Sequence, residues 1–296
     1  MSIPNMFKPW FVYRPVQILR RMARILHPPA DPIQVVTLPW GCPIEIDIRE
    51  TIGRSIWTVG VYDLAVVEVL FRLGDPKRLA LDAGANIGAM TGALACRSSE
   101  VWAFEPNPEV CPRLICNVAR WEGDPRFAKC RVYDLALSDV AGDSGLDCPE
   151  GFDNNHGIAS LTQASGARWC VKTARLDDLV EDRSIGLMKM DVEGHELSVL
   201  HGADATLTAG RIDHIVFEDH VGDKSPVCLF LIDRGYTILG IDWRLSGPRL
   251  MPRGQSSHRH YEAPNFLATR TPDLAIERCK RRGWECLTRS NSLRNQ

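Results

Sequence analysis

The stretch Leu81-Asp82-Ala83-Gly84-Ala85-Asn86-Ile87-Gly88 decides the fold, because it has the pattern of a buried strand, a tight turn and the start of a helix. Small residues crowd this turn, and Gly84 can adopt backbone angles that let a ligand approach the main chain. Gly88 permits close packing where the helix begins, and the free amides there favour an anionic group. The stretch therefore predicts a nucleotide-type ligand at the first strand–helix junction of an α/β sheet.

The spacing of the two glycines distinguishes between kinds of nucleotide ligand. A dinucleotide-binding turn has the pattern GxGxxG, whereas Gly84 and Gly88 are separated by three residues and Asp82 stands at the end of the strand. A carboxylate at this point would repel a pyrophosphate, but it suits a ligand that carries an amine and a sulfonium. Glu105 follows at the end of the next strand, close to the offset of ~20 residues expected for a carboxylate that binds ribose hydroxyls. These residues favour S-adenosylmethionine (SAM) over NAD.

The chain around this turn alternates apolar strands and helices, as a doubly wound sheet requires. We expect a Rossmann-like α/β fold with a seven-stranded, mostly parallel sheet and helices on both faces. The predicted strands span 78–83, 101–104, 130–137, 185–190, 212–217, 236–240 and 265–269, and the predicted helices span 61–73, 87–96, 108–121, 176–180, 196–205 and 227–234. Residues 142–170 are rich in Gly, Asp, Asn and Ser, and they predict an insertion or hairpin near the ligand.

Both ends of the chain lie outside this rhythm. We divide the chain into an N-terminal extension (1–57), a catalytic domain (58–272) and a basic C-terminal tail (273–296) that we expect to be frayed. The extension should hold an amphipathic helix over 15–26 and strands at 34–38 and 44–48. Aromatic and basic residues over 7–26 would suit peripheral contact with an anionic membrane. Packing of this helix on the body of the protein, or on a second copy in a homodimer, is the commoner role.

Composition excludes several classes of protein. The 296 residues are 45% hydrophobic and 24% charged with a net charge of −2, which is typical of a globular protein and gives no global attraction to nucleic acid. No apolar run reaches the ~20 residues of a membrane-spanning helix, and arginines interrupt the N-terminal apolar residues, unlike a signal peptide. The ten cysteines include no CxxC pair, which disfavours a zinc site and fits a reducing compartment. We therefore expect a cytoplasmic protein, with the inner membrane face as the site of any lipid contact.

Four strings give the chain a resemblance to a known family. They are LDAGANIGAMT (81–91), VWAFEPNPEVCPRLICNV (101–118), ALSD (136–139) and KMDVEGHELSVLHGA (189–203). Together they resemble the FkbM family of SAM-dependent methyltransferases over about residues 58–240, and the last string is the most specific of the four. The resemblance implies a class I methyltransferase fold, SAM as cofactor, and O-methylation of a sugar, glycolipid or secondary-metabolite hydroxyl.

The resemblance also implies roles for individual residues. Ser138 and Asp139 would lie beside the adenine of SAM, Glu105 would hold the ribose, and Met190 or Asp191 would approach the sulfonium. The methionine part of SAM would be surrounded by Asp82, Gly84, Ala85, Asn86 and Gly88.

An alcohol that accepts a methyl group must lose its proton, which requires a general base or a metal ion. Candidates should follow the strands at their carboxyl ends, where ligands bind in open α/β sheets. Two such strings follow the fourth and fifth strands: Asp191, Glu193, His195 and Glu196 in the first, and Glu218, Asp219 and His220 in the second. His220 and His195 are the natural bases because imidazole titrates near neutrality, with Asp191 and Glu218 as the other catalytic candidates.

Two alternatives stay open from the sequence. Asp191 and Asp219 are placed like the magnesium ligands of catechol-type methyltransferases, although we rank this below a metal-free mechanism and assign no metal ligand. A non-catalytic nucleotide-binding subunit is a further alternative, against which the intact acidic strand ends argue. Asn154, Asn155 and His156 lie in the irregular insertion, where a loop could close over the acceptor.

Overall fold

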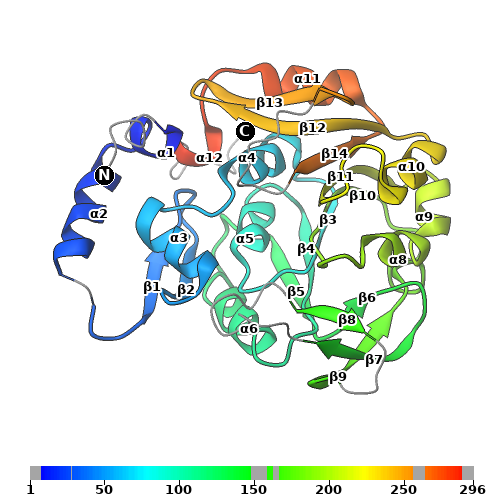
Figure 1. Cartoon of the computed structure of the whole chain (residues 1–296), viewed down its shortest axis with the longest axis horizontal. Helices are drawn as coiled ribbons and strands as arrows, with labels where there is room; N and C mark the ends of the chain where they lie inside the picture. Colours follow the sequence, from blue (N-terminus) through cyan, green and yellow to red (C-terminus); the bar gives the residue numbers. More distant parts are fainter. Residues whose placement is uncertain (1–7, 28, 148–158, 163–166, 256–263, 289–296) are drawn as a thin grey trace.

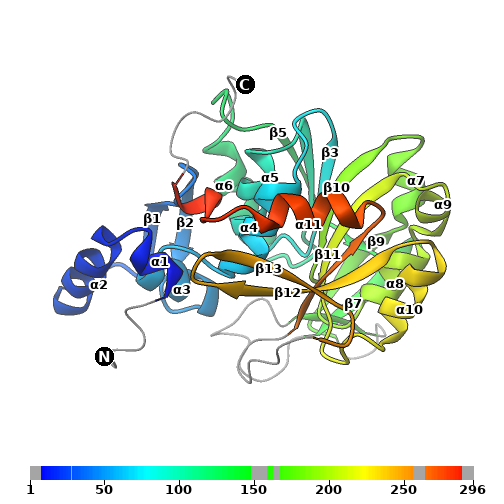
Figure 2. The ribbon, with the colours of Figure 1, turned by 90° about the horizontal axis from the view of Figure 1, so that it is seen from above.

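The computed structural model describes residues 8–27, 29–147, 159–162, 167–255 and 264–288, and a large mixed sheet forms its centre (Figures 1 and 2). The strand order is β13-β12-β14-β11-β10-β3-β4-β5. These eight strands are β3 (Leu79–Ala83), β4 (Glu100–Phe104), β5 (Lys129–Tyr133), β10 (Ile185–Met190), β11 (Ile212–Glu218), β12 (Thr237–Arg244), β13 (Gly247–Pro252) and β14 (Asn265–Thr269).

The direction of the strands fixes where a ligand can bind. β5, β4, β3, β10 and β11 are parallel, whereas β14, β12 and β13 pair antiparallel at one side. The chain winds outward from β3 in one direction and then returns to β10 on the other side of it, so a crevice opens between these two strands at their carboxyl ends. The expected Rossmann-like class I fold is confirmed, with one strand more than predicted because β13 forms a hairpin with β12.

Two apolar clusters cover the two faces of the sheet. One cluster joins the sheet to α4 (Leu64–Leu73) and α5 (Ala89–Ala95), together with N-terminal and C-terminal residues. The other joins it to α7 (Leu176–Val180), α8 (Glu196–His201), α9 (Asp204–Thr208) and α10 (Pro226–Asp233). Every residue of β3 and β10 is buried, which is why both strands are mostly apolar in the sequence, with Asp82 and Lys189 as the charged exceptions.

Local signals set the ends of several helices. Asp63 caps α4 by accepting a hydrogen bond from the amide of Val66, so this helix begins at Leu64 and not at the predicted residue 61. A helix that the sequence did not suggest, α3 (Thr51–Val59), precedes it and ends at Gly60, which has a φ of +88°. α6 (Cys111–Ala119) follows β4, within the predicted range.

The irregular segment after β5 forms a second, four-stranded sheet. Its order is β6-β9-β7-β8, with β6 (Ala136–Leu137), β7 (Gly142–Asp147), β8 (Ser160–Thr162) and β9 (Trp169–Ala174). The predicted strand over 130–137 is therefore two strands in two different sheets. The expected insertion is real, and its described part contributes residues to the pocket described below.

The N-terminal extension contains α1 (Pro9–Val12), α2 (Val16–Leu26) and the hairpin of β1 (Ile33–Thr37) and β2 (Pro43–Asp47). The apolar side chains of Leu19, Met22 and Leu26 are more than half exposed, so the expected packing of this apolar face on the body of the protein is wrong. No helix in the described part of the chain is long and apolar enough to cross a membrane.

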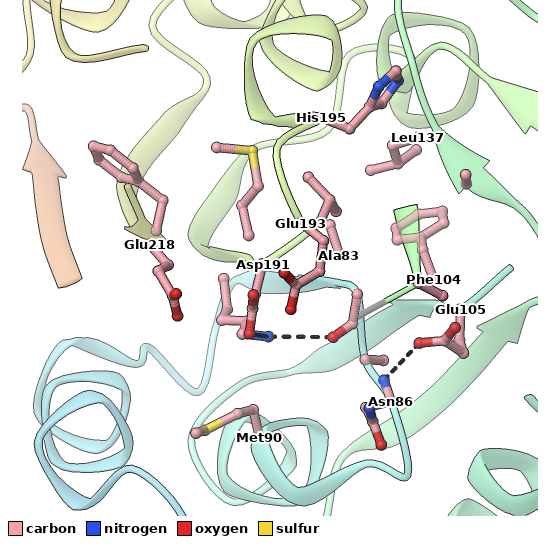
Figure 3. Close-up of a pocket in the computed structure, with 18 of the residues that line it drawn as sticks. Ala83, Asn86, Met90, Phe104, Glu105, Leu137, Asp191, Glu193, His195 and Glu218 are labelled. Atoms are coloured by element: carbon pink, nitrogen blue, oxygen red, sulfur yellow. Dashed lines mark hydrogen bonds and ion pairs between the residues drawn. The ribbon is translucent and has the colours of Figure 1, made fainter. Parts of the chain in front are cut away.

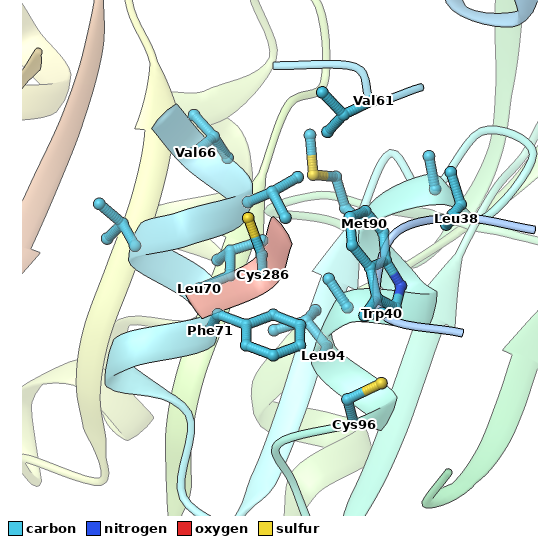
Figure 4. Packing of buried hydrophobic residues seen from close by; sticks show 14 of the residues in the cluster. Leu38, Trp40, Val61, Val66, Leu70, Phe71, Met90, Leu94, Cys96 and Cys286 are labelled. Carbon is cyan, nitrogen blue, oxygen red and sulfur yellow. The ribbon is translucent and has the colours of Figure 1, made fainter. Parts of the chain in front are cut away.

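The C-terminal residues up to 288 are packed, so the expected frayed tail is wrong over that range. α11 (Pro272–Lys280), α12 (Glu285–Thr288) and the segment between them contribute buried Cys279, Trp284 and Cys286 to the core. Figure 4 shows Cys286 against Val66 and Leu70 of α4. The extension and the tail thus share one cluster with the catalytic region. The division of the chain at residues 57 and 272 stays a prediction.

Candidate functional site

A hollow lies at the carboxyl ends of β3, β4, β10 and β11, where the topology places a ligand (Figure 3). It measures about 1240 Å³ including the part that is open to solvent. Its floor comes from the loop after β3 and from the strand ends, and one wall comes from the second sheet. The second sheet contributes the apolar residues Ala136, Leu137, Leu146 and Leu161, and the end of β4 contributes Phe104.

The loop after β3 is held in an unusual backbone conformation. Gly84 has a φ of +75°, and a Cβ there would lie 1.8 Å from the carbonyl oxygen of Asp191. Asn86 also has a positive φ, of +50°. The amides of Gly84 and Ala85 donate to the carbonyl of Phe104, so the loop is tied to β4 while it touches the end of β10. Only glycine fits at position 84, because any side chain would collide with backbone.

Glu105 joins this loop to the pocket. Its carboxylate accepts hydrogen bonds from the amides of Asn86, at 2.8 Å, and Asn107, at 3.0 Å, and it lines the hollow (Figure 3). Burial raises the pKa of Glu105 to about 7, against the opposing effect of these two amides. The residue is in position to accept hydrogen bonds from a diol such as a ribose, and it positions the glycine-rich loop as well.

Asp82 and Gly88 lie behind the hollow and do not line it. Asp82 is fully buried, where it accepts a 2.6 Å hydrogen bond from the hydroxyl of Thr91 and lies 3.9 Å from the ammonium of Lys189. Gly88 has a φ of +93°, and a Cβ there would lie 2.9 Å from the side chain of Leu114. Asp82 and Gly88 therefore expose no surface to the hollow through which the predicted direct contacts with SAM could form. Both residues support the loop from behind.

Lys189 is a site residue whose role was not predicted from the sequence. Its ammonium contacts the carbonyl of Gly84 at 3.2 Å and the carboxylate of Asp191 at 3.1 Å. Burial opposes the charge of Lys189, but Asp191 and Asp82 outweigh it and raise the pKa of the ammonium. Lys189 thus ties the end of β10 to the turn after β3. The sequence feature that could have identified Lys189 is its position at the start of the most specific string, KMDVEGHE.

Three carboxylates turn toward the same space above the loop: Asp191, Glu193 and Glu218 (Figure 3). Burial raises the pKa of Glu218 to about 7, with a further contribution from the charge of Asp191. Burial likewise raises the pKa of Glu193 to about 7, again with Asp191 as the next cause. Glu193 has a φ of +50°, which is strained for a residue with a side chain. A partly exposed acidic cluster of this kind suits a cationic ligand and proton transfer near neutral pH.

His195 lines the pocket, whereas Ser138 and Asp139 do not. The Nε2 of His195 and the Oγ of Ser138 form a 2.9 Å hydrogen bond, and Ser138 also donates to Asp139. Burial lowers the pKa of His195, which keeps the ring neutral. In this sheet Ala136 and Leu137 occupy the wall where Ser138 and Asp139 were expected, because β6 turns those two side chains away.

His220 and Asp219 lie outside the wall of the hollow. The side chain of His220 is 75% exposed, and its Nε2 lies 3.0 Å from the Oε1 of Glu218. Asp219 accepts from the amides of Val221 and Gly222, so its carboxylate serves the loop after β11. Among the described residues, no three His, Cys, Asp or Glu side chains converge as a metal site requires. This geometry gives the magnesium alternative no support at Asp219.

Three further polar residues line the hollow. Asp63 lies between α3 and α4 and accepts a 3.1 Å hydrogen bond from Asn265 at the start of β14. Tyr62 precedes it, and burial raises the pKa of this phenol. Strand β14 comes late in the chain, so only the tertiary structure brings Asn265 to the site. Asn154, Asn155 and His156, which were expected to close over the acceptor, lie outside the described residues.

The residues present fit SAM by their chemistry. The hollow holds a buried carboxylate at the end of the second strand, an apolar wall suited to a base, and an acidic cluster suited to an amine and a sulfonium. Gly84, Ala85 and Asn86 would hold the methionine part, Glu105 the ribose, and Phe104 with Leu137 the adenine. Asp191 and Glu193 belong to the acidic cluster and would lie near the amine and the sulfonium.

We expect Glu105→Gln to weaken SAM binding by about 10- to 100-fold, the range of one hydrogen bond to a charged group. The substitution removes that charge and places an amide donor against the amides of Asn86 and Asn107. Isothermal calorimetry with SAM measures the change. Glu122→Gln, on an exposed carboxylate, is the control and should leave affinity unchanged. Wild-type affinity in Glu105→Gln would contradict the assignment.

Comparisons with known proteins agree with this site. The Methyltransferase FkbM domain matches residues 82–238, which is more than half of the chain. Hexuronic acid methyltransferase AglP of Haloferax volcanii is 32% identical over 164 residues, covering 53% of this chain and 62% of that protein. 2-O-methyltransferase NoeI of Sinorhizobium fredii is 27% identical over 175 residues, covering 51% of this chain and 68% of that protein. The aligned part thus spans less than two thirds of AglP.

Solved structures give a weaker overlay. Methyltransferase FkbM from Methylobacillus flagellatus superposes with a TM-score of 0.44 at 18% identity, covering 65% of this chain and 44% of that one. Magnesium protoporphyrin IX methyltransferase from Synechocystis, with bound SAM, gives 0.42 at 12% identity over 91% of this chain and 98% of that one. Membership of the family therefore rests on the sequence match and not on these overlays.

Proposed function

Because the chain belongs to the FkbM family of SAM-dependent methyltransferases, we propose that it methylates a hydroxyl group of a sugar, a glycolipid or a secondary metabolite. The observation that carries this proposal is the convergence of Asp191, Glu193 and Glu218 on the hollow beside the loop after β3. Such a cluster offers a base to an acceptor next to the place where the family's cofactor fits. The relative AglP is named a hexuronic acid methyltransferase and NoeI a 2-O-methyltransferase, and these names support a sugar-type acceptor and transfer to oxygen.

Bound SAM supplies a methyl group that is already activated on a sulfonium, so the protein chiefly has to position the acceptor and take its proton. We assign proton removal to Glu218, because it lines the hollow and its raised pKa of about 7 lets it both ionise and accept a proton near neutral pH. The exposed ring of His220, which contacts Glu218, then offers the proton a route to solvent.

The other catalytic candidates take supporting roles in this proposal. The carboxylate of Asp191 is held by Lys189 and strengthens the negative field of the pocket. His195 is engaged with Ser138 and has a lowered pKa, so it orients the wall near the second sheet and accepts no proton from the acceptor. His220, the first choice from the sequence, acts through Glu218.

The charges of the pocket wall narrow the class of acceptor. Among the described residues of the wall, Lys189 is the only lysine or arginine, and it is already engaged with Asp191 and Gly84. A uronic acid would bring its carboxylate toward three others. We therefore propose a neutral hydroxyl, such as that of an uncharged sugar residue.

The test is methyl transfer from radiolabelled SAM to paired methyl glycosides, one a neutral hexoside and the other its hexuronoside. Transfer to the neutral compound at least about tenfold faster is expected, since one like-charge contact at partial exposure costs about 1–2 kcal/mol. Faster transfer to the hexuronoside would overturn the charge argument. Binding of NAD without binding of SAM in calorimetry would overturn the proposed reaction itself.

We further expect turnover to persist within about twofold in excess EDTA, because the proposed carboxylate base takes the acceptor proton directly and needs no metal ion bound to the acceptor oxygen. The measurement is the initial rate with and without chelator, followed by addition of Mg²⁺. A loss that Mg²⁺ restores would favour the magnesium alternative instead. SAM affinity should be the same with and without EDTA, so that a change in rate cannot come from weaker cofactor binding.

A further inference from the structure

Helix α2 (Val16–Leu26) presents its apolar side to solvent and its polar side to the protein, which is the reverse of an ordinary surface helix. The outer face consists of Val16, Leu19, Met22 and Leu26, with exposed fractions of 58%, 67%, 51% and 70%. Figures 1 and 2 both place α2 at the outer edge of the molecule, away from the central sheet. This outer face is therefore covered by nothing in the described chain.

Specific contacts hold the helix in this orientation. Arg24 donates a hydrogen bond to the carbonyl of Trp57 in α3, and its guanidinium lies 3.7 Å from the centre of the Trp57 ring. Gln17, on the same side of α2, is 4% exposed. The polar side of α2 is thus fixed against α3, and the outer face points away from the body as a consequence.

Helix α2 and the residues just before it carry several basic side chains and no acidic ones. Residues 8–27 include Lys8, Arg14, Arg20, Arg21 and Arg24, and contain no Asp or Glu. Three of these form a basic hollow between α2 and β1, lined by Arg14, Arg20 and Arg24. In the described part of the chain, no carboxylate forms an ion pair with these three arginines.

The arginines of the basic hollow also repel one another. Burial lowers the pKa of Arg14 and of Arg24, and the neighbouring charge of Arg20 lowers both further. An anion of matching shape would relieve this repulsion, and the guanidinium group is well suited to phosphate oxygens. Val35 of β1 lines the same hollow and is 54% exposed, which extends the apolar surface next to the basic one.

We propose that α2 docks this chain on an anionic phospholipid surface, with the outer face at the boundary between headgroups and acyl chains and the basic hollow against lipid phosphates. A helix with one apolar side, flanked by arginines and free of acidic residues, has the chemistry of an interfacial membrane helix. The docking does not depend on which acceptor the catalytic pocket takes. α3 joins the two regions, because its Trp57 stacks on Arg24 and its Ile52 lines the catalytic pocket.

A second copy of the chain is the competing occupant of the outer face. A two-fold contact would bring α2 against its symmetry mate, and it would place two sets of five like charges side by side. Such a contact has no acidic partner in residues 8–27, whereas an anionic lipid surface supplies the opposite charge. The charge pattern therefore favours lipid over self-association.

The experiment is flotation of the full chain with vesicles of phosphatidylcholine alone or of two parts phosphatidylcholine to one part phosphatidylglycerol. We expect binding to the mixed vesicles only, weakened by added salt. The double variant Leu19→Gln/Met22→Gln should bind at least about tenfold more weakly, since two apolar side chains no longer enter the interface. Arg20→Gln should also weaken binding to the mixed vesicles, by about fivefold as expected for one basic residue near such a surface.

Controls separate docking from folding and from the catalytic site. Leu229→Gln replaces a leucine of α10 that is 52% exposed, and it should bind vesicles like the wild type. SAM affinity in calorimetry should stay unchanged in all these variants. Absence of binding to mixed vesicles, or wild-type binding by Leu19→Gln/Met22→Gln, would overturn the proposal. So would light scattering that finds a dimer which this double variant dissociates, because a second copy would then cover the outer face.

Discussion

Glu218→Gln is expected to lower kcat by about 10²- to 10⁴-fold, the usual contribution of a general base, while SAM affinity stays within about twofold. The carboxylate lines the hollow from the end of β11, and no other described group there combines a raised pKa with contact to an exposed histidine. Glutamine preserves the shape of the side chain but cannot accept the acceptor proton. Single-turnover kinetics with saturating SAM measures the chemical step.

A matched set of variants separates chemistry from charge. His220→Gln should cost less than Glu218→Gln, because His220 acts only through Glu218 and does not line the hollow. Glu122→Gln changes an exposed carboxylate and should be neutral. If Glu218→Gln keeps full turnover with SAM bound, Glu218 is not the base.

The pH profile supplies a second readout of the same base. The groups that face Glu218 are Asp191 and Asp63, which raise its pKa, and His220 and Lys189, which lower it; burial has the largest effect and brings the pKa to about 7. A base must be ionised, so kcat/KM should fall as pH drops below about 7 and level off above it. Bound SAM adds positive charge, which shifts this limb toward lower pH. In Glu218→Gln the limb should disappear.

Glu68→Gln is expected to destabilise the protein by about 3–5 kcal/mol, because it leaves the charge of Arg72 buried without its partner. The two side chains of α4 are 0% and 1% exposed and lie 2.6 Å apart. Glu68 also accepts hydrogen bonds from the amides of Glu285 and Cys286. Arg72 donates to four carbonyls of the C-terminal segment, those of Arg278, Cys279, Arg281 and Gly283. This pair therefore holds the C-terminal segment on the core.

The measurement is urea unfolding or the melting temperature, which should fall by roughly 10 °C for a chain of this size. Glu277→Gln, on an exposed carboxylate of α11, should change the free energy of unfolding by less than about 0.5 kcal/mol. A change below about 1 kcal/mol in Glu68→Gln would mean that the C-terminal segment is not anchored through this pair.

Sequence periodicity predicted the central sheet well because its strands are buried on both faces. β3 and β10 are mostly apolar, and the turn between β3 and α5 is rich in small residues, which is typical of a tight strand–helix junction. The same reasoning failed where structure depends on distant partners. The C-terminal segment has a sequence that looks like a basic tail, but Glu68 and Arg72, more than 200 residues away, bind it at Glu285 and Arg281. α2 has an apolar face that suggested packing on the body, and contacts with α3 turn this face outward.

The candidate site divides in the same way. The stretch Leu81–Gly88, Glu105 and the string from Lys189 to Glu196 could be identified from the chain itself, because each combines strand-end position with residue types that only a ligand or a tight turn explains. Which side chains face the hollow could not be predicted. Asp82, Ser138 and His220 stand next to pocket residues in sequence, but Asp82 bonds to Thr91, Ser138 bonds to His195 and His220 is exposed beyond the end of β11, so none of them lines the hollow.

By itself, then, the sequence determined the α/β fold, the nucleotide-type turn and the acidic strand ends, because these depend on local composition and on period. Only the tertiary structure decided that Glu218 and not His220 lines the pocket, that Lys189 joins β10 to the turn at Gly84, and that Asn265 reaches the site from β14. These facts depend on sheet order and on the register between strands that are far apart in the chain. No local pattern records that register, because it is set by the packing of both faces of the sheet at once.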